Sequence, residues 1–95
     1  IVIIVANNAM YGTIRMHQEQ RYPGRVVATT LVNPDFVAFA RSFGAAAAGV
    51  ESTRACAPAL QRALAAKGPT LIELRIDPEA ISPRRTLSQI RGKSL

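Results

Sequence analysis

The sequence predicts an α/β protein with a mostly parallel sheet and flanking helices, in three layers. Residues 1–6 form a continuous aliphatic run, which is typical of a strand buried on both faces. Residues 70–76, TLIELRI, alternate between two faces and predict another strand. Helical patterns separate these segments, and strands separated by helices pair in parallel. We therefore expect residues 1–6 to be a central strand, preceded by further strands of a longer α/β protein.

The first helix is predicted from Tyr11 to about Arg21. Within it, Glu19 lies four residues after Arg15, a spacing that allows the two side chains to form an ion pair. The turn sequence Tyr22-Pro23-Gly24 ends the helix. Residues 24–33 are rich in β-branched side chains, so we expect an extended connection there.

The second helix has a clear start signal. Asn33 can cap it, Pro34 suits the first helical position, and Asp35 suits the positive end of the helix dipole. Gly44 is expected to end it. Its apolar stripe consists of Phe36, Val37, Phe39, Ala40 and Phe43.

A short strand and a third helix follow. Residues 45–50 are ambiguous by propensity, but their place between two helices indicates a strand. Ser52 or Thr53 can start the next helix, in which Pro58 is tolerable only in the first turn. Lys67-Gly68-Pro69 is expected to close this helix with a C-cap glycine and a proline.

The net charge of +6 is concentrated near the C-terminus. Residues 82–95 hold Arg84, Arg85, Arg91 and Lys93 and no acid, which accounts for +4 of the +6. This segment contains no aromatic residue, so we interpret it as a basic tail that is solvated or contacts a partner, not as a nucleic-acid site. We accordingly divide the chain into residues 1–81, a domain portion, and residues 82–95, the tail.

The chain has one cysteine and one histidine, and neither gives much support to a metal site or a catalytic role. Cys56 is the only cysteine, which argues against a disulfide framework or a cysteine metal site and favours a cytoplasmic protein. His17 is the only histidine and has no acidic or cysteine partner at ligand spacing.

The apolar start is too short to span a bilayer, so we expect no membrane association. Glu51, Glu73 and Arg75 are interpreted as surface or strand-edge charges.

Two asparagines, Asn7 and Asn8, follow the first predicted strand directly. Ligands of open α/β sheets bind beyond the carboxyl ends of the strands. An asparagine oxygen can contribute to an octahedral magnesium site, and the amides at the start of the next helix can bind phosphate. An ordinary strand-to-helix turn explains the same two residues, so local sequence leaves both interpretations open.

The wider stretch NNAMYGTIR, residues 7–15, resembles the end of the cofactor-binding motif of thiamine-diphosphate-dependent enzymes. The segments RMHQEQRYPGR, NPDFVAFARSFG and GPTLIELRIDPEAISPR resemble the C-terminal cofactor-binding domain of the acetolactate synthase and benzoylformate decarboxylase group. The resemblance extends from Ile1 to about Arg91. It implies that the chain is the C-terminal portion of a thiamine-diphosphate-binding (PP) domain.

The resemblance also implies roles for particular residues. Asn8 would bind magnesium through its side-chain oxygen, and Met10 through its backbone carbonyl. The diphosphate would lie against Tyr11, Gly12 and Thr13, largely at their backbone amides. Ile14 would face the thiazolium ring and the substrate. Asn7 matches the motif but is expected to hold the turn.

Two parts of the family's active site have no counterpart in this sequence. The Gly-Asp-Gly triplet that supplies the magnesium carboxylate is absent, as is the glutamate, usually from a partner subunit, that activates the cofactor. We therefore expect no catalytic residue in this chain and no activity of the isolated 95 residues. The resemblance implies a parent homo-oligomer, a dimer or tetramer with its active site between subunits, that uses thiamine diphosphate and Mg²⁺.

Three functions remain open at this stage. The parent could be an acetolactate synthase-like enzyme that decarboxylates a 2-oxo acid and joins the product to a second one. It could be a benzoylformate decarboxylase-like enzyme that only decarboxylates. A third possibility, of another class, is a small basic binding module that uses residues 82–95. The sequence does not identify the 2-oxo acid or show whether a flavin is present.

Overall fold

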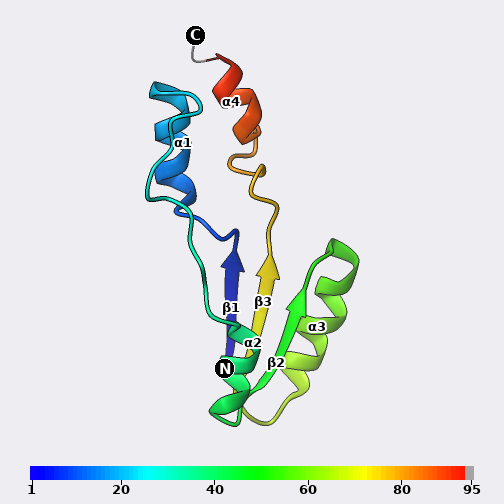
Figure 1. Ribbon diagram of the computed structural model, residues 1–95. Helices are drawn as coiled ribbons and strands as arrows, with labels where there is room; N and C mark the ends of the chain where they lie inside the picture. The colour runs from blue at the N-terminus through cyan, green and yellow to red at the C-terminus, as the bar shows by residue number, and fades with distance from the viewer. Residues whose placement is uncertain (94–95) are drawn as a thin grey trace. The chain divides into compact units, whose positions relative to one another are not determined.

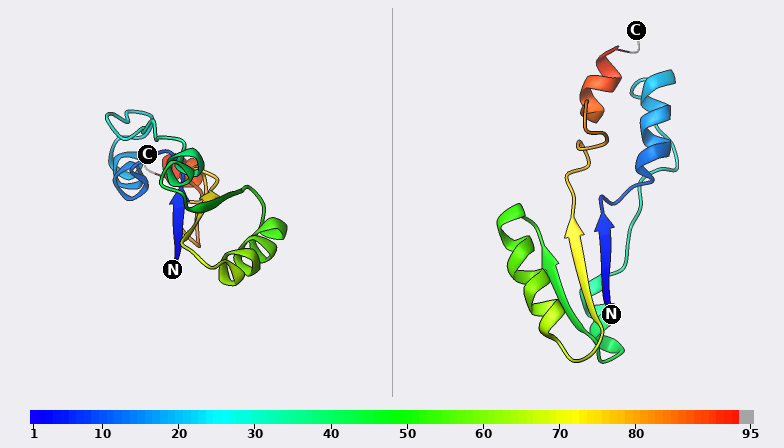
Figure 2. Two further views of the ribbon diagram at one scale, coloured as in Figure 1. Left: turned by 90° about the horizontal axis from the view of Figure 1, so that it is seen from below. Right: turned by 180° about the vertical axis from the view of Figure 1, so that it is seen from behind.

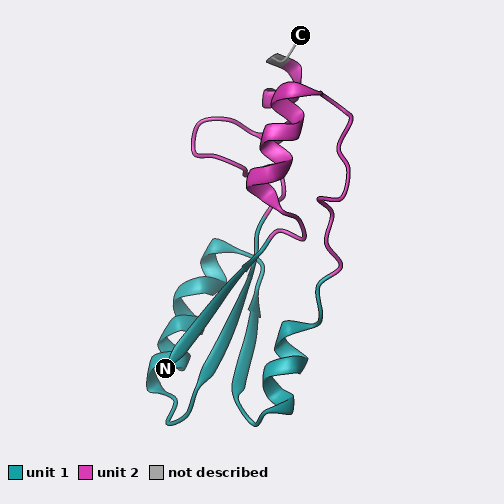
Figure 3. Ribbon diagram, turned by 90° about the vertical axis from the view of Figure 1, so that its left-hand side faces the viewer, with its two compact units in different colours: residues 1–7, 33–76 teal, residues 8–32, 77–95 magenta. Residues whose placement is uncertain are grey.

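The computed structural model describes residues 1–93, and these residues form two units (Figure 3). The sheet unit consists of residues 1–7 and 33–76. The helical unit consists of residues 8–32 and 77–93 of the described chain. The first division therefore falls between the two adjacent asparagines, which places Asn7 in the sheet unit and Asn8 in the helical unit.

The sheet unit contains three parallel strands, β1 (Val2–Asn7), β2 (Ala46–Val50) and β3 (Thr70–Arg75) (Figures 1 and 2). Their order is β1-β3-β2. The structure thus confirms the parallel α/β prediction and the short strand that was inferred from context. Within the described residues β3 forms hydrogen bonds on both sides and β1 lies at an edge. The central place expected for the first strand depended on further strands of a longer protein, so it stays a prediction.

Two helices cover opposite faces of this sheet, α2 (Phe36–Ser42) and α3 (Thr53–Ala65) (Figure 3). The side chains between α3 and the sheet form a buried cluster, to which Val2, Cys56 and Leu74 add partly buried contacts. Alternation along the strands assigns successive residues to the two faces. The predicted three-layer arrangement is therefore confirmed. The buried members of the cluster are Val50, Ala59, Ala63 and Ile72.

The start of α2 differs from the prediction. Asp35, not Asn33, is the N-cap, and its carboxylate accepts a hydrogen bond of 3.0 Å from the Ala38 amide. Asn33 instead donates from its side chain to the side-chain oxygen of Asn7 at 2.8 Å. Both residue types cap helices well, so the sequence alone did not decide between them.

The ends of α3 also differ from the prediction. Ser52 is the N-cap and accepts a hydrogen bond of 3.2 Å from the Ala55 amide. Pro58 is the sixth residue of the helix, beyond the first turn in which it was expected. It removes the amide that would bond to the carbonyl of Arg54, and Arg54 is exposed, so water can satisfy that carbonyl. Ala66 is the C-cap, ahead of the predicted Gly68.

The capping of α2 yields a direct test. Asp35→Ala is expected to lower the local opening free energy of α2 by about 0.5–2 kcal/mol, because the Ala38 amide loses its acceptor. Native-state hydrogen exchange at Ala38 measures this change. Asn33→Ala is the matched control and should leave Ala38 exchange unchanged. Equal effects of the two substitutions would contradict the assignment of the cap.

The helical unit contains α1 (Gly12–Arg21) and α4 (Leu87–Lys93). Residues 87–93 of the predicted basic tail form α4, a helix that the sequence analysis did not predict, while residues 94–95 lie outside the described chain. Leu87 and Ile90 are buried, and their spacing of three places both on one face of α4. None of the helices within residues 1–93 has the length and apolar character needed to cross a membrane.

An ion pair joins the two helices of this unit. Arg91 donates from Nε to Oε2 of Glu19 at 2.5 Å, and the Glu19 side chain is fully buried. The predicted pair of Glu19 with Arg15 is therefore not formed. The hydrogen bond from Arg91 lowers the pKa of the Glu19 carboxyl against an opposing effect of burial, and a bond from the Gly24 amide adds to the lowering.

The lowered pKa of Glu19 predicts acid sensitivity of the helical unit. The carboxylate stabilises the folded unit fully above its ordinary pKa of 4.5. This contribution is lost as the pH falls through the lower folded pKa, because the carboxyl takes up a proton. The protection factors of the α4 amides, which correct for the intrinsic pH dependence of exchange, should therefore fall at the acid end when measured from pH 7 to pH 3. Glu19→Gln should flatten this fall, and an unchanged pH profile in that variant would contradict the role of the Glu19 carboxylate.

Candidate functional site

Asn8 follows β1 directly in the sequence and forms a local turn. Its side-chain oxygen Oδ1 accepts a hydrogen bond of 3.3 Å from the Met10 amide, two residues later. This is the pattern of an asparagine that stabilises a turn through its own backbone. An amide oxygen has two lone pairs, so one bond from Met10 leaves capacity for a cation. This hydrogen bond holds the half-buried Asn8 side chain close to the backbone of Met10.

Ala9, between these two residues, has a left-handed backbone with a φ of 58°. A residue other than glycine pays about 1–2 kcal/mol for this conformation. Two hydrogen bonds to a distant segment secure it, one of 2.8 Å from the Leu31 amide to the Ala9 carbonyl and one of 2.9 Å from the Tyr11 amide to the Thr29 carbonyl. Met10 and Thr30 form an antiparallel bridge between them. The turn is therefore held by the segment that contains Thr29 and Leu31 as well as by the Asn8 side chain.

The start of α1 is suited to an anion. Tyr11 occupies the N-cap position and makes no side-chain capping hydrogen bond, and the first turn holds no acidic residue. The first amides of a helix lack partners within the helix, and the helix dipole makes this end positive. The amides after Tyr11 can therefore donate to a diphosphate. The Tyr11 amide, which was also predicted to do so, donates to the Thr29 carbonyl instead.

The predicted cofactor residues lie together. Five of the six line one hollow of about 270 Å³. The sixth, Asn8, lies against Gly12: a Cβ built on Gly12 would be 2.8 Å from the Asn8 side-chain nitrogen and 3.1 Å from Cδ1 of Ile81. The structure thus brings all six into one part of the helical unit. The five lining residues are Met10, Tyr11, Gly12, Thr13 and Ile14.

Two neutral oxygen atoms of this site fit a hard cation such as Mg²⁺, the side-chain oxygen of Asn8 and the carbonyl oxygen of Met10. Within residues 1–93, no cluster of three or more histidine, cysteine or acidic side chains could hold a metal. A metal bound at this site would therefore take neutral oxygen ligands from the described residues.

Comparison with known proteins decides the family. The family model described as "Thiamine pyrophosphate enzyme, C-terminal TPP binding domain" matches residues 1–74. The chain belongs to the thiamine pyrophosphate enzyme family. Its place in that family is the C-terminal TPP-binding domain, which confirms the resemblance carried by NNAMYGTIR and the segments after it.

Individual relatives agree with this assignment. An acetolactate synthase of Bacillus subtilis (strain 168) is 36% identical over 77 residues, which cover 81% of this chain. An acetolactate synthase large subunit of Parasynechococcus marenigrum (strain WH8102) is 32% identical over 78 residues, which cover 80% of this chain. The chain spans 13% of the length of each of these relatives.

Asn7 has a structural contact in the TPP-binding domain. Its side-chain oxygen accepts the 2.8 Å hydrogen bond from Asn33, the residue at which the chain re-enters the sheet unit. The amide of Ile76 also donates to the backbone carbonyl of Asn7 at 2.9 Å. Asn7 therefore ties the end of β1 to two later parts of the sheet unit. Its expected role in holding the turn stays a prediction.

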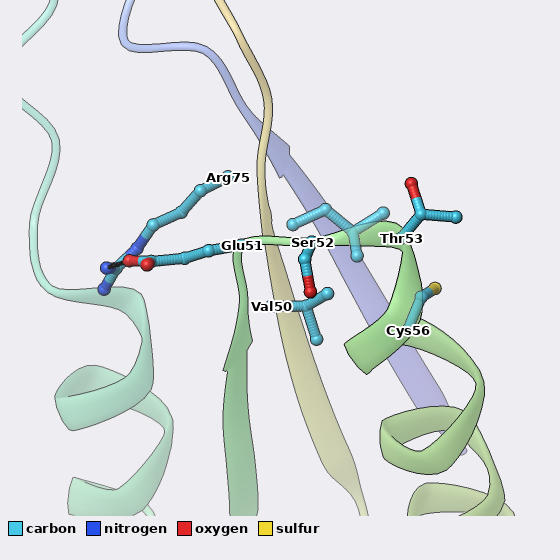
Figure 4. A pocket seen from close by; sticks show the side chains of 7 residues that line it. Val50, Glu51, Ser52, Thr53, Cys56 and Arg75 are labelled. Carbon is cyan, nitrogen blue, oxygen red and sulfur yellow. Dashed lines mark hydrogen bonds and ion pairs between the residues drawn. The ribbon is translucent and has the colours of Figure 1, made fainter.

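A second hollow, of about 270 Å³, lies in the sheet unit where β2 and β3 end (Figure 4). Glu51 and Arg75 point toward each other there and form an ion pair. Arg75 also donates from Nε to Glu73 at 2.9 Å. The hydrogen bond to Glu73 is the largest cause that raises the pKa of the Arg75 guanidinium, and the bond to Glu51 also raises it. Glu73 is only 3% exposed, so its expected place at the surface is wrong. It is buried because β3 is the central strand.

Four residues of the helical unit that the sequence did not identify are joined by hydrogen bonds near the predicted site: Arg15, Gln18, Thr29 and Thr30. Their side chains connect α1 to the segment that secures Ala9. Only the β-branched character of residues 24–33 hinted at an ordered segment. That pattern predicted an extended backbone without indicating which residues it contacts.

The contact of Gly12 with Asn8 generates a prediction. Gly12→Ala in the full-length protein should push the Asn8 side chain out of place and weaken Mg²⁺ binding about tenfold or more. The fold should survive, because the atom displaced is the end of a movable side chain. Magnesium titration in the presence of thiamine diphosphate, with thermal unfolding as the test of folding, measures both effects.

Gly68→Ala is the matched control, since a Cβ at Gly68 would meet no atom within 4 Å. It should leave the magnesium affinity unchanged. An unchanged affinity in folded Gly12→Ala would show that the position of Asn8 does not govern metal binding.

Proposed function

We propose that this chain is the C-terminal cofactor-binding part of a thiamine-diphosphate- and Mg²⁺-dependent enzyme that acts on a 2-oxo acid in the manner of acetolactate synthase. The observation that carries the proposal is the grouping of Met10 to Ile14 around one hollow at the uncapped start of α1, beside Asn8. The names of the relatives support acetolactate synthase as the type of enzyme.

In this proposal the chain binds and orients the cofactor. Asn8 and Met10 contribute neutral oxygen ligands to Mg²⁺, and the first amides of α1 donate to the diphosphate. Bound thiamine diphosphate supplies the carbon nucleophile and electron sink for decarboxylation of the 2-oxo acid. Gly12 leaves room for the Asn8 side chain, and Ile14, 53% exposed, offers an apolar surface at the mouth of the hollow.

The remaining parts of the active site are proposed to come from the rest of the enzyme. A magnesium carboxylate and the glutamate that activates the cofactor would be supplied by other segments, the latter across a subunit interface in a homo-oligomer. The 95 residues would then be inactive alone. Joining of two 2-oxo acids would likewise depend on residues outside this chain.

Removal of the Asn8 oxygen tests the proposal. In the full-length protein, Asn8→Ala should weaken the binding of Mg²⁺ and thiamine diphosphate together by at least tenfold, because the metal connects the protein to the diphosphate. Isothermal titration of the cofactor at several Mg²⁺ concentrations measures the coupling.

Asn8→Asp is the matched control, because it keeps an oxygen ligand at the same place and should retain Mg²⁺-dependent binding. Cofactor affinity that does not depend on Mg²⁺ in the wild-type protein would overturn the proposal. So would wild-type affinity in a folded Asn8→Ala variant.

A further inference from the structure

The segment after α1 returns along that helix (Figure 1). Its residues Thr29 and Leu31 form the two backbone hydrogen bonds, of 2.9 and 2.8 Å, that secure Tyr11 and Ala9. This segment therefore contacts the backbone of the predicted magnesium and diphosphate ligands without lining their hollow. Any change in its position would be passed directly to the turn around Ala9.

Side chains of α1 hold this segment in place. Arg15 donates from Nε to the Thr29 hydroxyl at 2.6 Å and from Nη2 to the Thr30 hydroxyl at 2.7 Å. Gln18 donates from Nε2 to the Val27 carbonyl at 2.9 Å. We call Arg15, Gln18, Thr29 and Thr30 the Arg15 clamp.

Thr29 is the centre of the clamp and is only 2% exposed. Its hydroxyl accepts the bond from Arg15 and donates to the side-chain oxygen of Gln18 at 3.1 Å. The hydroxyl is therefore used both as acceptor and as donor. Because buried polar groups are costly when a partner is lost, removal of this hydroxyl should loosen both side chains at once.

The clamp lies where the backbone needs support. Ala9 and Ala28 both have a φ of 58°, and they are the non-glycine residues with positive φ in the described chain. Strained residues persist only where their surroundings hold them, and they gather at functional sites. Here one strained residue lies in the predicted metal turn and the other lies beside Thr29 in the clamped segment.

We infer that the Arg15 clamp sets the affinity for magnesium and diphosphate by holding residues 9–11 in their binding shape. This inference rests on the proposed function. Arg15 and Thr29 are positioning residues: they act through the backbone of Ala9 and Tyr11. Loosening the clamp should weaken cofactor binding while leaving the chemistry of the fully loaded enzyme largely unchanged.

The test uses the full-length enzyme with Thr29→Val and Thr29→Ser. Valine has the shape of threonine without the hydroxyl, and serine keeps the hydroxyl. Without cofactor, Thr29→Val should speed hydrogen exchange of the Tyr11 and Leu31 amides at least tenfold. With Mg²⁺ and thiamine diphosphate, it should raise the cofactor dissociation constant about tenfold, with kcat at saturating cofactor within about twofold of wild type. Thr29→Ser should restore both affinity and protection.

Arg15→Met provides a second disruption in case Thr29→Val does not fold. Arg21→Met, an exposed arginine of the same helix, is its matched control. Arg15→Met should reproduce the faster exchange and weaker binding, and Arg21→Met should do neither. Agreement of the two clamp variants would support the inference.

Two outcomes separate failure of the inference from failure of the proposed function. If the wild-type enzyme binds thiamine diphosphate with Mg²⁺ and the clamp variants bind equally well, the inference is overturned and the proposed function stands. If the wild-type enzyme does not bind the cofactor, the proposed function is overturned and the positioning role falls with it. Unchanged exchange at Tyr11 and Leu31 in both clamp variants would overturn the inference whatever the cofactor does.

Discussion

The left-handed turn at Ala9 is the constraint on which the proposed site depends. It directs the chain from the end of β1 into α1 within a few residues. Asn8 supports the turn from one side through its bond to Met10, and the backbone of Thr29 and Leu31 supports it from the other. An alanine accepts this conformation only because its neighbours hold it.

The same turn explains why the site combines two kinds of ligand-binding group. Asn8 comes before the turn and can offer a side-chain oxygen, whereas the amides of α1 come after it and can offer donors. A magnesium ion bound to a diphosphate needs both. The short distance between Asn8 and Gly12 keeps these groups close, and the lack of a side chain at Gly12 makes that distance possible.

Much of this arrangement could be predicted from local sequence. The three strands, the first three helices and the grouping of Met10 to Ile14 depend on local pattern or on the family motif, and the structure contains all of them. The capping of α2 was less certain, because Asn33 and Asp35 are both good caps and only the contact of Asn33 with Asn7 separates them.

Contacts between distant parts of the chain could not be predicted. Glu19 has Arg15 at suitable helical spacing, yet it pairs with Arg91, which is 72 residues away in sequence. Arg15 instead donates to the hydroxyls of Thr29 and Thr30. Glu73 is buried because its strand is central, a position that the alternation of TLIELRI does not reveal.

The decisive measurement is a crystal structure of the full-length enzyme with Mg²⁺ and thiamine diphosphate. We expect the Asn8 side-chain oxygen and the Met10 carbonyl oxygen to lie about 2.0–2.1 Å from the metal. We also expect Ala9 to remain left-handed and the diphosphate to accept hydrogen bonds from the first amides of α1. A metal bound without Asn8 and Met10, or a diphosphate bound away from α1, would contradict it.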